Sequence, residues 1–130
     1  MKKIIFTSLI LISSLYAELK NEYLSQSILD SKIPIVDIRT PGEWKETGII
    51  KGSIPIVFFN EQGKYDINGF LKELNKKVDT TKPFALICRT GSRTKIVSAF
   101  LSTKLNYKVT NILGGIMYPQ IKNPPFISYK

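Results

Sequence analysis

The stretch that decides the fold is PFALICRTGSRTKIVSAFLSTKL, residues 83–105. Its first part, at 84–87, is a short apolar run introduced by Pro83, and such a run is typical of a buried strand. After a polar loop, apolar side chains recur at the spacing of a helix that faces a core: Ile96, Val97, Phe100, Leu101 and Leu105. This order of a strand, a loop and a helix predicts one unit of an α/β fold.

Strands and helices alternate outward from this unit along the chain. The sequence predicts further strands at 35–38, 52–59 and 109–113, and further helices at 18–29, 41–47 and 67–78. Thr40 is expected to cap the helix that Pro41 opens and Gly48 ends. Buried parallel strands need cover on both faces, so the alternation predicts an α/β fold with a small, mainly parallel central sheet and helices on both faces. Residues 122–125 are expected to be irregular.

The composition fits one folded domain and excludes several mechanisms. The 130 residues are 43% hydrophobic and 22% charged, and about 100–200 residues is the size of one domain. One Cys and no His exclude an intramolecular disulfide, Ser-His-Asp or Cys-His catalysis and His-ligated zinc. The net charge of +9 attracts anions without selecting one.

The first seventeen residues have the pattern of a secretory signal peptide. Lys2 and Lys3 precede an apolar stretch at 4–15, and Ala17 is a small residue at a cleavage point. The stretch is shorter than the ~20 residues that span a bilayer, so we favour removal over a permanent anchor, and the lack of a polar face disfavours a buried core segment. We predict a signal peptide at 1–17, a single domain at 18–130, and an exported periplasmic protein with no membrane span after processing.

The loop at 88–94, CRTGSRT, carries the strongest signs of chemistry. Ligands of open α/β sheets bind at the carboxyl ends of strands, and Cys88 lies at that end of the predicted strand. The loop leads into a helix amino-terminus, whose free N–H groups and dipole favour an anion and stabilise a thiolate. Gly91 allows successive N–H groups to face one anion. We therefore predict that Cys88 is a nucleophile; a buried, inert thiol is the alternative.

The few arginines concentrate near this loop. The chain has three Arg against sixteen Lys; Arg89 and Arg93 lie in the loop, and Arg39 follows another strand. A guanidinium can grip an oxyanion with two N–H groups, whereas an ammonium is a point charge. We predict that Arg93 is the principal group for an anionic substrate and Arg89 an auxiliary one, with a solvated loop as the alternative. The predicted substrate-binding set is Arg89, Thr90, Gly91, Ser92, Arg93 and Thr94.

These residues give the sequence a resemblance to the rhodanese-domain sulfurtransferases. Residues 88–94 look like the active-site loop of that family, 37–54 resemble its amino-terminal signature, and 109–115 resemble the strand and double glycine that close the domain. The resemblance implies a rhodanese-like fold and sulfurtransferase activity. Two positions depart from the pattern: Ile49 stands where His is usual, and Tyr118-Pro119 replaces the Trp after the glycines. Neither is the nucleophile, so we expect altered packing near the site rather than lost activity.

Three residues of the amino-terminal signature are predicted to support the site structurally. Asp37 and Arg39 lie at the end of the predicted strand 35–38, beside the catalytic strand in the expected sheet. Arg39 and Glu43 are expected to pair and hold this segment, a structural role with which the family resemblance agrees. Trp44 is expected in the core or at a pocket rim.

The leading hypothesis is sulfur transfer through a persulfide on Cys88. The thiolate would take the outer sulfur of thiosulfate or a similar small anionic donor, and a thiol or cyanide would then remove it. The acceptor must come from outside because the chain has no second Cys, and a partner protein is one such acceptor. We expect a monomer that needs no cofactor, no metal and no nucleic acid.

Two other functions stay open at this point. The loops of Cys-based phosphatases and arsenate reductases resemble a Cys, five residues and then an Arg, whereas four residues separate Cys88 from Arg93. The shorter loop favours a single sulfur over a tetrahedral oxyanion. The other alternative is an exported, non-enzymatic module that carries sulfur or binds a partner, with which the departures from the family pattern are compatible.

Overall fold

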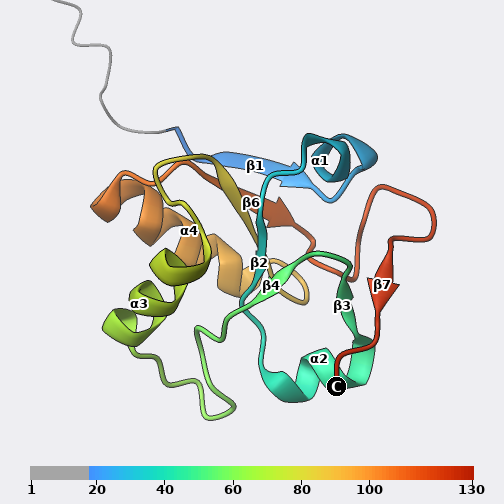
Figure 1. Cartoon of the computed structure of the whole chain (residues 1–130), viewed down its shortest axis with the longest axis horizontal. Helices are drawn as coiled ribbons and strands as arrows, with labels where there is room; N and C mark the ends of the chain where they lie inside the picture. The colour runs from blue at the N-terminus through green and yellow to red at the C-terminus, as the bar shows by residue number, and fades with distance from the viewer. Residues whose placement is uncertain (1–17) are drawn as a thin grey trace, which may run out of the picture.

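The computed structural model describes residues 18–130 (Figure 1). The signal peptide predicted at 1–17 lies outside the described residues. Within 18–130, no helix has the length and apolar character needed to cross a membrane.

A five-stranded sheet forms the centre of the fold, in the order β1-β6-β5-β2-β4. Its neighbouring strands are all parallel. The strands are Lys20–Tyr23 (β1), Ile35–Asp37 (β2), Ile54–Pro55 (β4), Phe84–Ile87 (β5) and Val109–Leu113 (β6). A second sheet pairs Ile49–Ile50 (β3) with Phe126–Ile127 (β7) in antiparallel orientation. The mainly parallel central sheet predicted from the sequence is therefore confirmed.

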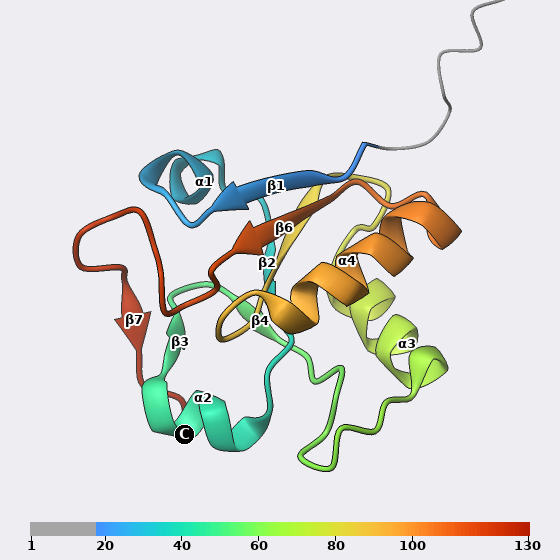
Figure 2. The same cartoon turned by 180° about the vertical axis from the view of Figure 1, so that it is seen from behind.

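Helices pack on both faces of this sheet. They are Gln26–Ser31 (α1), Pro41–Thr47 (α2), Ile67–Lys77 (α3) and Ser92–Leu105 (α4). Both views show α3 and α4 together, apart from α1 (Figures 1 and 2). Alternate residues of β5 face opposite sides: Phe84 and Leu86 pack with the α3 and α4 side chains, whereas Ile87 packs with Ile28 of α1. This period of two buries β5 on both faces.

The expected helix at 18–29 is wrong in its first half. Residues 20–23 form β1, which pairs with β6 from Lys20 opposite Thr110 to Tyr23 opposite Leu113. The helix begins only after Ser25, whose side chain accepts the N–H of Ile28. All four β1 side chains are exposed, so the sequence has no alternation of buried and exposed residues from which a strand could be predicted. Pairing with β6 instead determines the conformation of this segment.

The short strands depend on contacts between distant segments. The strand expected at 52–59 is confined to the two residues of β4, and β3 and β7 were not predicted. Ile49 pairs with Ile127 and Ile50 with Phe126, so these strands form where two distant parts of the chain meet. Residues 122–125 lie outside any helix or strand, as expected.

The start of α2 follows its sequence signals closely. The Thr40 hydroxyl accepts the N–H of Glu43, and the Glu43 carboxylate accepts the N–H of Thr40, which is a capping box. Gly48 ends the helix at φ 78°, where an added Cβ would lie 2.4 Å from the Ile127 carbonyl oxygen. The predicted helices at 67–78 and before Leu105 are confirmed as α3 and α4.

Candidate active site

Cys88 directly follows β5 at the carboxyl end of the parallel sheet. Four residues after Cys88 the chain enters α4, which begins at Ser92 after Gly91. Gly91 has a φ of 99°, and an added Cβ would lie 3.0 Å from the backbone nitrogen of Gly114. A residue without a side chain therefore allows the turn that places Cys88 below a helix amino-terminus.

The Cys88 sulfur has two polar neighbours at the base of this turn. Its Sγ accepts the backbone N–H of Gly91 at 3.2 Å. The thiol also lies within hydrogen-bonding distance of the Thr94 hydroxyl, at 3.6 Å, and that hydroxyl donates to the Gly91 carbonyl at 3.3 Å. Cys88 and Thr94 are both fully buried. The sulfur thus lies at the floor of the loop, where a backbone donor can stabilise negative charge.

Arg93 and Glu43 form a two-pronged ion pair beside this sulfur. Arg93 Nη1 and Nη2 donate to Glu43 Oε1 and Oε2 at 2.6 and 2.8 Å. The hydrogen bonds from Arg93 hold the pKa of Glu43 below its ordinary value, although burial opposes them. The charge of Arg93 and the hydrogen bonds from Thr40 lower this pKa further. The hydrogen bond to Glu43 raises the pKa of Arg93, and the charge of Glu43 adds to this, although burial opposes both. The pair fixes α2 to the first turn of α4.

The expected ion pair between Arg39 and Glu43 is wrong. The Arg39 guanidinium instead binds Asp37 through Nε, at 3.0 Å to Oδ1 and 3.1 Å to Oδ2, and through Nη2 at 2.8 Å to Oδ2. Of Glu43 it reaches only the backbone carbonyl, at 3.4 Å. Because the Glu43 side chain also caps α2, it points toward α4 and meets Arg93 there. Arg39 thus pairs with Asp37, and Glu43 pairs with Arg93.

An open cavity of about 510 Å³ lies beside the loop. Four predicted site residues line it: Glu43, Arg89, Ser92 and Arg93. Arg89 and Ser92 are exposed, whereas Arg93 is partly covered. Of the other predicted site residues, Thr90 is exposed, Gly91 supplies the N–H to the sulfur, and Thr94 is buried beneath it.

Five further residues of the cavity wall were not predicted as site residues. They are Phe59, Asn60, Glu61, Gly63 and Ile96. The first four come from a turn far from the loop in sequence, and no motif marks them. Ile96 fitted the apolar spacing of a core helix, but it is 64% exposed. Its position one turn into α4, next to the polar loop, was the available signal.

The turn after β6 holds the loop from the other side. The N–H groups of Ile116 and Met117 donate to the carbonyls of Cys88 and Arg89 at 3.0 and 3.1 Å. A Cβ on Gly115 would lie 2.3 Å from the Cys88 carbonyl oxygen, so this close approach requires glycine. Ile49, at the usual His position, is buried in β3. Within residues 18–130, no cluster of three or more His, Cys, Asp or Glu could hold a metal ion.

The family model named rhodanese-like domain matches residues 20–118, which include β1, the Cys88 loop and the turn after β6. The chain belongs to the rhodanese-like domain family. The resemblance seen in the sequence is thereby confirmed at the level of the domain.

One protein is similar to this rhodanese-like domain in sequence, and two solved structures are similar to it in fold. An uncharacterized protein of Rickettsia prowazekii (strain Madrid E) is 34% identical over 84 residues, which cover 62% of this chain and 66% of that protein, slightly less than two thirds of its length. The crystal structure of a protein of M. tuberculosis matches with a TM-score of 0.63 at 16% identity, covering 84% of this chain and 88% of that one. A protein of Staphylococcus saprophyticus subsp. saprophyticus matches with a TM-score of 0.54 at 29% identity, over 72% and 82% of the two chains.

Proposed function

We propose that this rhodanese-like protein is a sulfurtransferase that carries sulfane sulfur on Cys88. The observation that carries the proposal is the Gly91 N–H, which donates to the Cys88 Sγ at 3.2 Å where the loop enters α4. No side chain caps the amino-terminus of α4. The helix dipole and free N–H groups at such an end favour a negatively charged sulfur.

The reaction divides into two displacements at sulfur. In the first, the Cys88 thiolate attacks the outer sulfur of thiosulfate; the new Sγ–S bond forms as the S–S bond of thiosulfate breaks, and sulfite leaves with the electron pair of that bond. In the second, an external thiolate or cyanide attacks the outer sulfur of the persulfide, giving an organic persulfide or thiocyanate and restoring the Cys88 thiolate. No net oxidant or reductant is needed. The loop N–H groups would stabilise the charge on the terminal sulfur.

The two loop arginines take different roles in this proposal. The Arg93 guanidinium is engaged by Glu43, so much of its charge is already neutralised. Arg89 is exposed and lines the cavity beside the loop. We therefore assign the first contact with an anionic donor to Arg89 and the shaping of the loop to Arg93, which reverses the ranking that the sequence suggested.

The acceptor and the location are part of the proposal. Cys88 is the only cysteine of the chain, so the persulfide must pass to an outside thiol, which a small molecule or a partner protein can present. We propose that residues 1–17 direct export to the periplasm and are then removed. Amino-terminal sequencing of the protein from a cell-envelope fraction tests this: a chain that begins at Glu18 supports it, and a retained Met1 contradicts it.

Intact-mass analysis before and after incubation with thiosulfate tests the chemistry. The protein should gain the mass of one sulfur, lose it on addition of cyanide, and release one sulfite per sulfur bound. Cys88→Ser is the matched control, because it changes one atom and should show no gain. A persulfide that forms but never passes to any acceptor would favour a sulfur-binding module over an enzyme. No gain in the wild-type protein would refute the proposal.

A further inference from the structure

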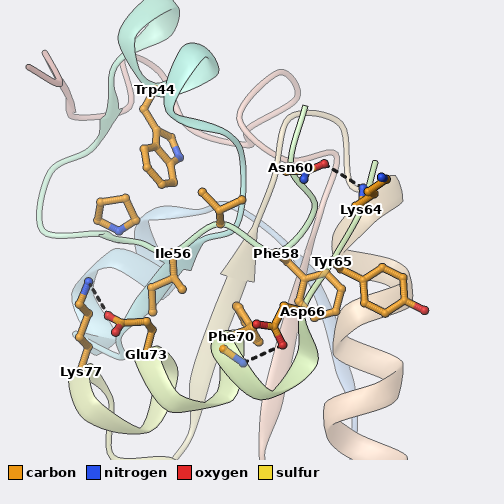
Figure 3. Close-up of a pocket in the computed structure, with 13 residues that line it drawn as sticks. Trp44, Ile56, Phe58, Asn60, Lys64, Tyr65, Asp66, Phe70, Glu73 and Lys77 are labelled. Atoms are coloured by element: carbon orange, nitrogen blue, oxygen red, sulfur yellow. Dashed lines mark hydrogen bonds and ion pairs between the residues drawn. The ribbon is translucent and has the colours of Figure 1, made fainter. Parts of the chain in front are cut away.

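A second cavity, away from Cys88, has the dimensions of a ligand site. It has a volume of about 620 Å³ and lies between α2, the segment around Ile56 and α3 (Figure 3). Small-molecule sites occupy about 300–1,000 Å³. None of the residues 88–94 lines this cavity, so the proposed sulfur chemistry leaves it without a role.

An aromatic cluster forms one wall of the cavity. The rings of Phe58 and Tyr65 are stacked, with centroids 5.5 Å apart and planes 18° apart, and Phe70 meets Phe58 edge-on at 4.8 Å. Phe58 and Phe70 are buried, but Tyr65 is 59% exposed. Tyr65 therefore has free ring surface beside a preformed stack, an arrangement that favours a planar aromatic ligand.

The opposite wall contains a buried donor without a partner. Figure 3 shows the Trp44 indole extending from α2 toward the cavity. Trp44 is only 4% exposed, and its Nε1–H has no hydrogen-bond partner among the described residues. A buried N–H without a partner is costly, so an acceptor that reaches it after a small turn of the ring would be stabilised.

Two carboxylates and two ammonium groups line the cavity, and one of the ammonium groups has no ion pair with any described residue. Asp66 accepts the N–H of Gly69 at 3.1 Å and so caps α3, and Glu73 pairs with Lys77 at 3.5 Å. Among residues 18–130, the ammonium of Lys64 has no ion pair or hydrogen bond. Figure 3 shows Lys64 and the Glu73–Lys77 pair at opposite ends of the cavity. The Lys64 ammonium is therefore available to pair with an anionic group of a ligand at that end.

We propose that this cavity binds a small aromatic anion. Its ring lies against the Phe58–Tyr65 stack, its anionic group lies at the Lys64 end, and an acceptor atom takes the Trp44 N–H. None of the residues 88–94 takes part, although Asn60 lines both this cavity and the one beside the Cys88 loop. The proposal therefore does not depend on sulfur transfer.

Two probes that differ by one group test the proposal. They are 8-anilinonaphthalene-1-sulfonate and N-phenyl-1-naphthylamine, which share a ring system and differ in the sulfonate. Because Trp44 is the only tryptophan of the chain, energy transfer from the indole to either probe reports occupancy close to it. The sulfonate should bind at one site per chain and about tenfold more tightly than the neutral probe at low ionic strength.

Matched variants locate the binding. Lys64→Gln should remove the advantage of the sulfonate, whereas Lys72→Gln, an exposed α3 lysine that does not line the cavity, should keep it. Trp44→Phe keeps a ring but loses the N–H, and should weaken binding measured by calorimetry. Cys88→Ser should bind the probe as the wild type does.

Several outcomes would overturn the proposal. They are absence of saturable binding, an equal loss in Lys64→Gln and Lys72→Gln, which would indicate general charge attraction, and loss of binding in Cys88→Ser, which would place the probe at the sulfur site. If Trp44→Phe proves unstable, the single indole N–H resonance of the ¹⁵N-labelled wild type replaces it: the resonance must shift on saturation, and an unmoved resonance contradicts the indole contact.

Discussion

Two arginine–carboxylate pairs lie in very different surroundings, although their carboxylates, Asp37 and Glu43, are only six residues apart in the chain. Arg39 binds Asp37, two residues away, and both side chains are fully buried. Arg93 binds Glu43 across fifty residues, and the two side chains are 25% and 23% exposed. The chemistry of the two pairs is the same. Their burial and the elements that they join decide what each can do.

The buried pair organises the scaffold behind the site. Beyond Asp37, Arg39 donates to the Thr47 hydroxyl at 2.7 Å and to the Gly48 carbonyl at 2.8 Å. It therefore ties the end of β2 to the carboxyl end of α2. The partly exposed pair instead joins α2 to the first turn of α4, which directly follows the Cys88 turn. We infer that the first pair governs whether α2 is in place, and the second governs how the loop lies against it.

Breaking the buried pair should have the largest effect. Arg39→Ala leaves the Asp37 carboxylate buried without its partner, and such a loss costs about 3–5 kcal/mol. That is a large part of the ~5–15 kcal/mol that stabilises a domain. Urea unfolding followed by far-ultraviolet circular dichroism measures it. Lys45→Ala, at an exposed position on α2, is the control and should change stability by less than about 0.5 kcal/mol. A loss below about 1 kcal/mol in Arg39→Ala would show that this pair is dispensable.

Breaking the partly exposed pair of Arg93 and Glu43 should affect activity more than folding. Glu43→Gln should cost only about 1 kcal/mol of stability, but it releases Arg93 from the geometry that shapes the loop. We expect kcat/KM for sulfur transfer to fall at least tenfold, which corresponds to about 1.4 kcal/mol. The fall should be equal for thiosulfate and for a neutral sulfur donor, because the loop rather than the donor contact is altered. If kcat/KM fell for thiosulfate but not for the neutral donor, Arg93 rather than Arg89 would be the residue that binds the anionic donor.

Arg89 lines the same cavity as Arg93 but has no carboxylate partner in the described part of the chain. It therefore tests what a loop arginine does when it is not held by an ion pair. Arg89→Ala should lower kcat/KM for thiosulfate severalfold, and the loss should shrink as ionic strength rises, since an exposed charge is screened. A neutral donor should be turned over as by the wild type. Arg89→Lys should recover most of the activity if charge is sufficient. Equal losses with charged and neutral donors would mean that Arg89 holds the loop instead.

The sequence was sufficient for the elements whose signals are local. The apolar run of β5, the cap at Thr40 and the spacing of apolar residues in α3 each depend on a few neighbouring residues, and the structure has the strand and helices that they predict. The domain family followed from the order of three such segments. The expected helix at 18–29 failed because β1 is an exposed edge strand whose conformation depends on pairing with β6.

The site was harder to predict because its contacts join distant segments. Sequence proximity favoured Arg39 as the partner of Glu43, but the capping geometry of Thr40 turns the Glu43 carboxylate toward Arg93. The cavity wall at Phe59 and Asn60 comes from a turn that no motif marks. Local patterns thus selected the Cys88 loop as the candidate site, and only the packing of α2 against α4 could identify the contacts that hold it.

The smallest expected effect is a difference between wild type and Glu43→Gln in how the free energy of unfolding changes at acidic pH. Its pKa is lowered in the folded protein, mainly by the hydrogen bond from Arg93. The Glu43 carboxylate therefore contributes stability above its ordinary value of 4.5, and that contribution disappears as the pH falls through the lower folded value. Because the pair is partly exposed, the contribution is at most about 1 kcal/mol. Urea unfolding from about pH 7 to about pH 3 should show wild type more stable than Glu43→Gln near neutrality, with the two curves converging below pH 4.5. The lowered pKa of Asp79, which comes from hydrogen bonds with Thr81, is common to both proteins and cancels in the difference. Arg93 stays charged throughout this range. Curves that stay parallel would mean that the ion pair with Arg93 does not stabilise the fold.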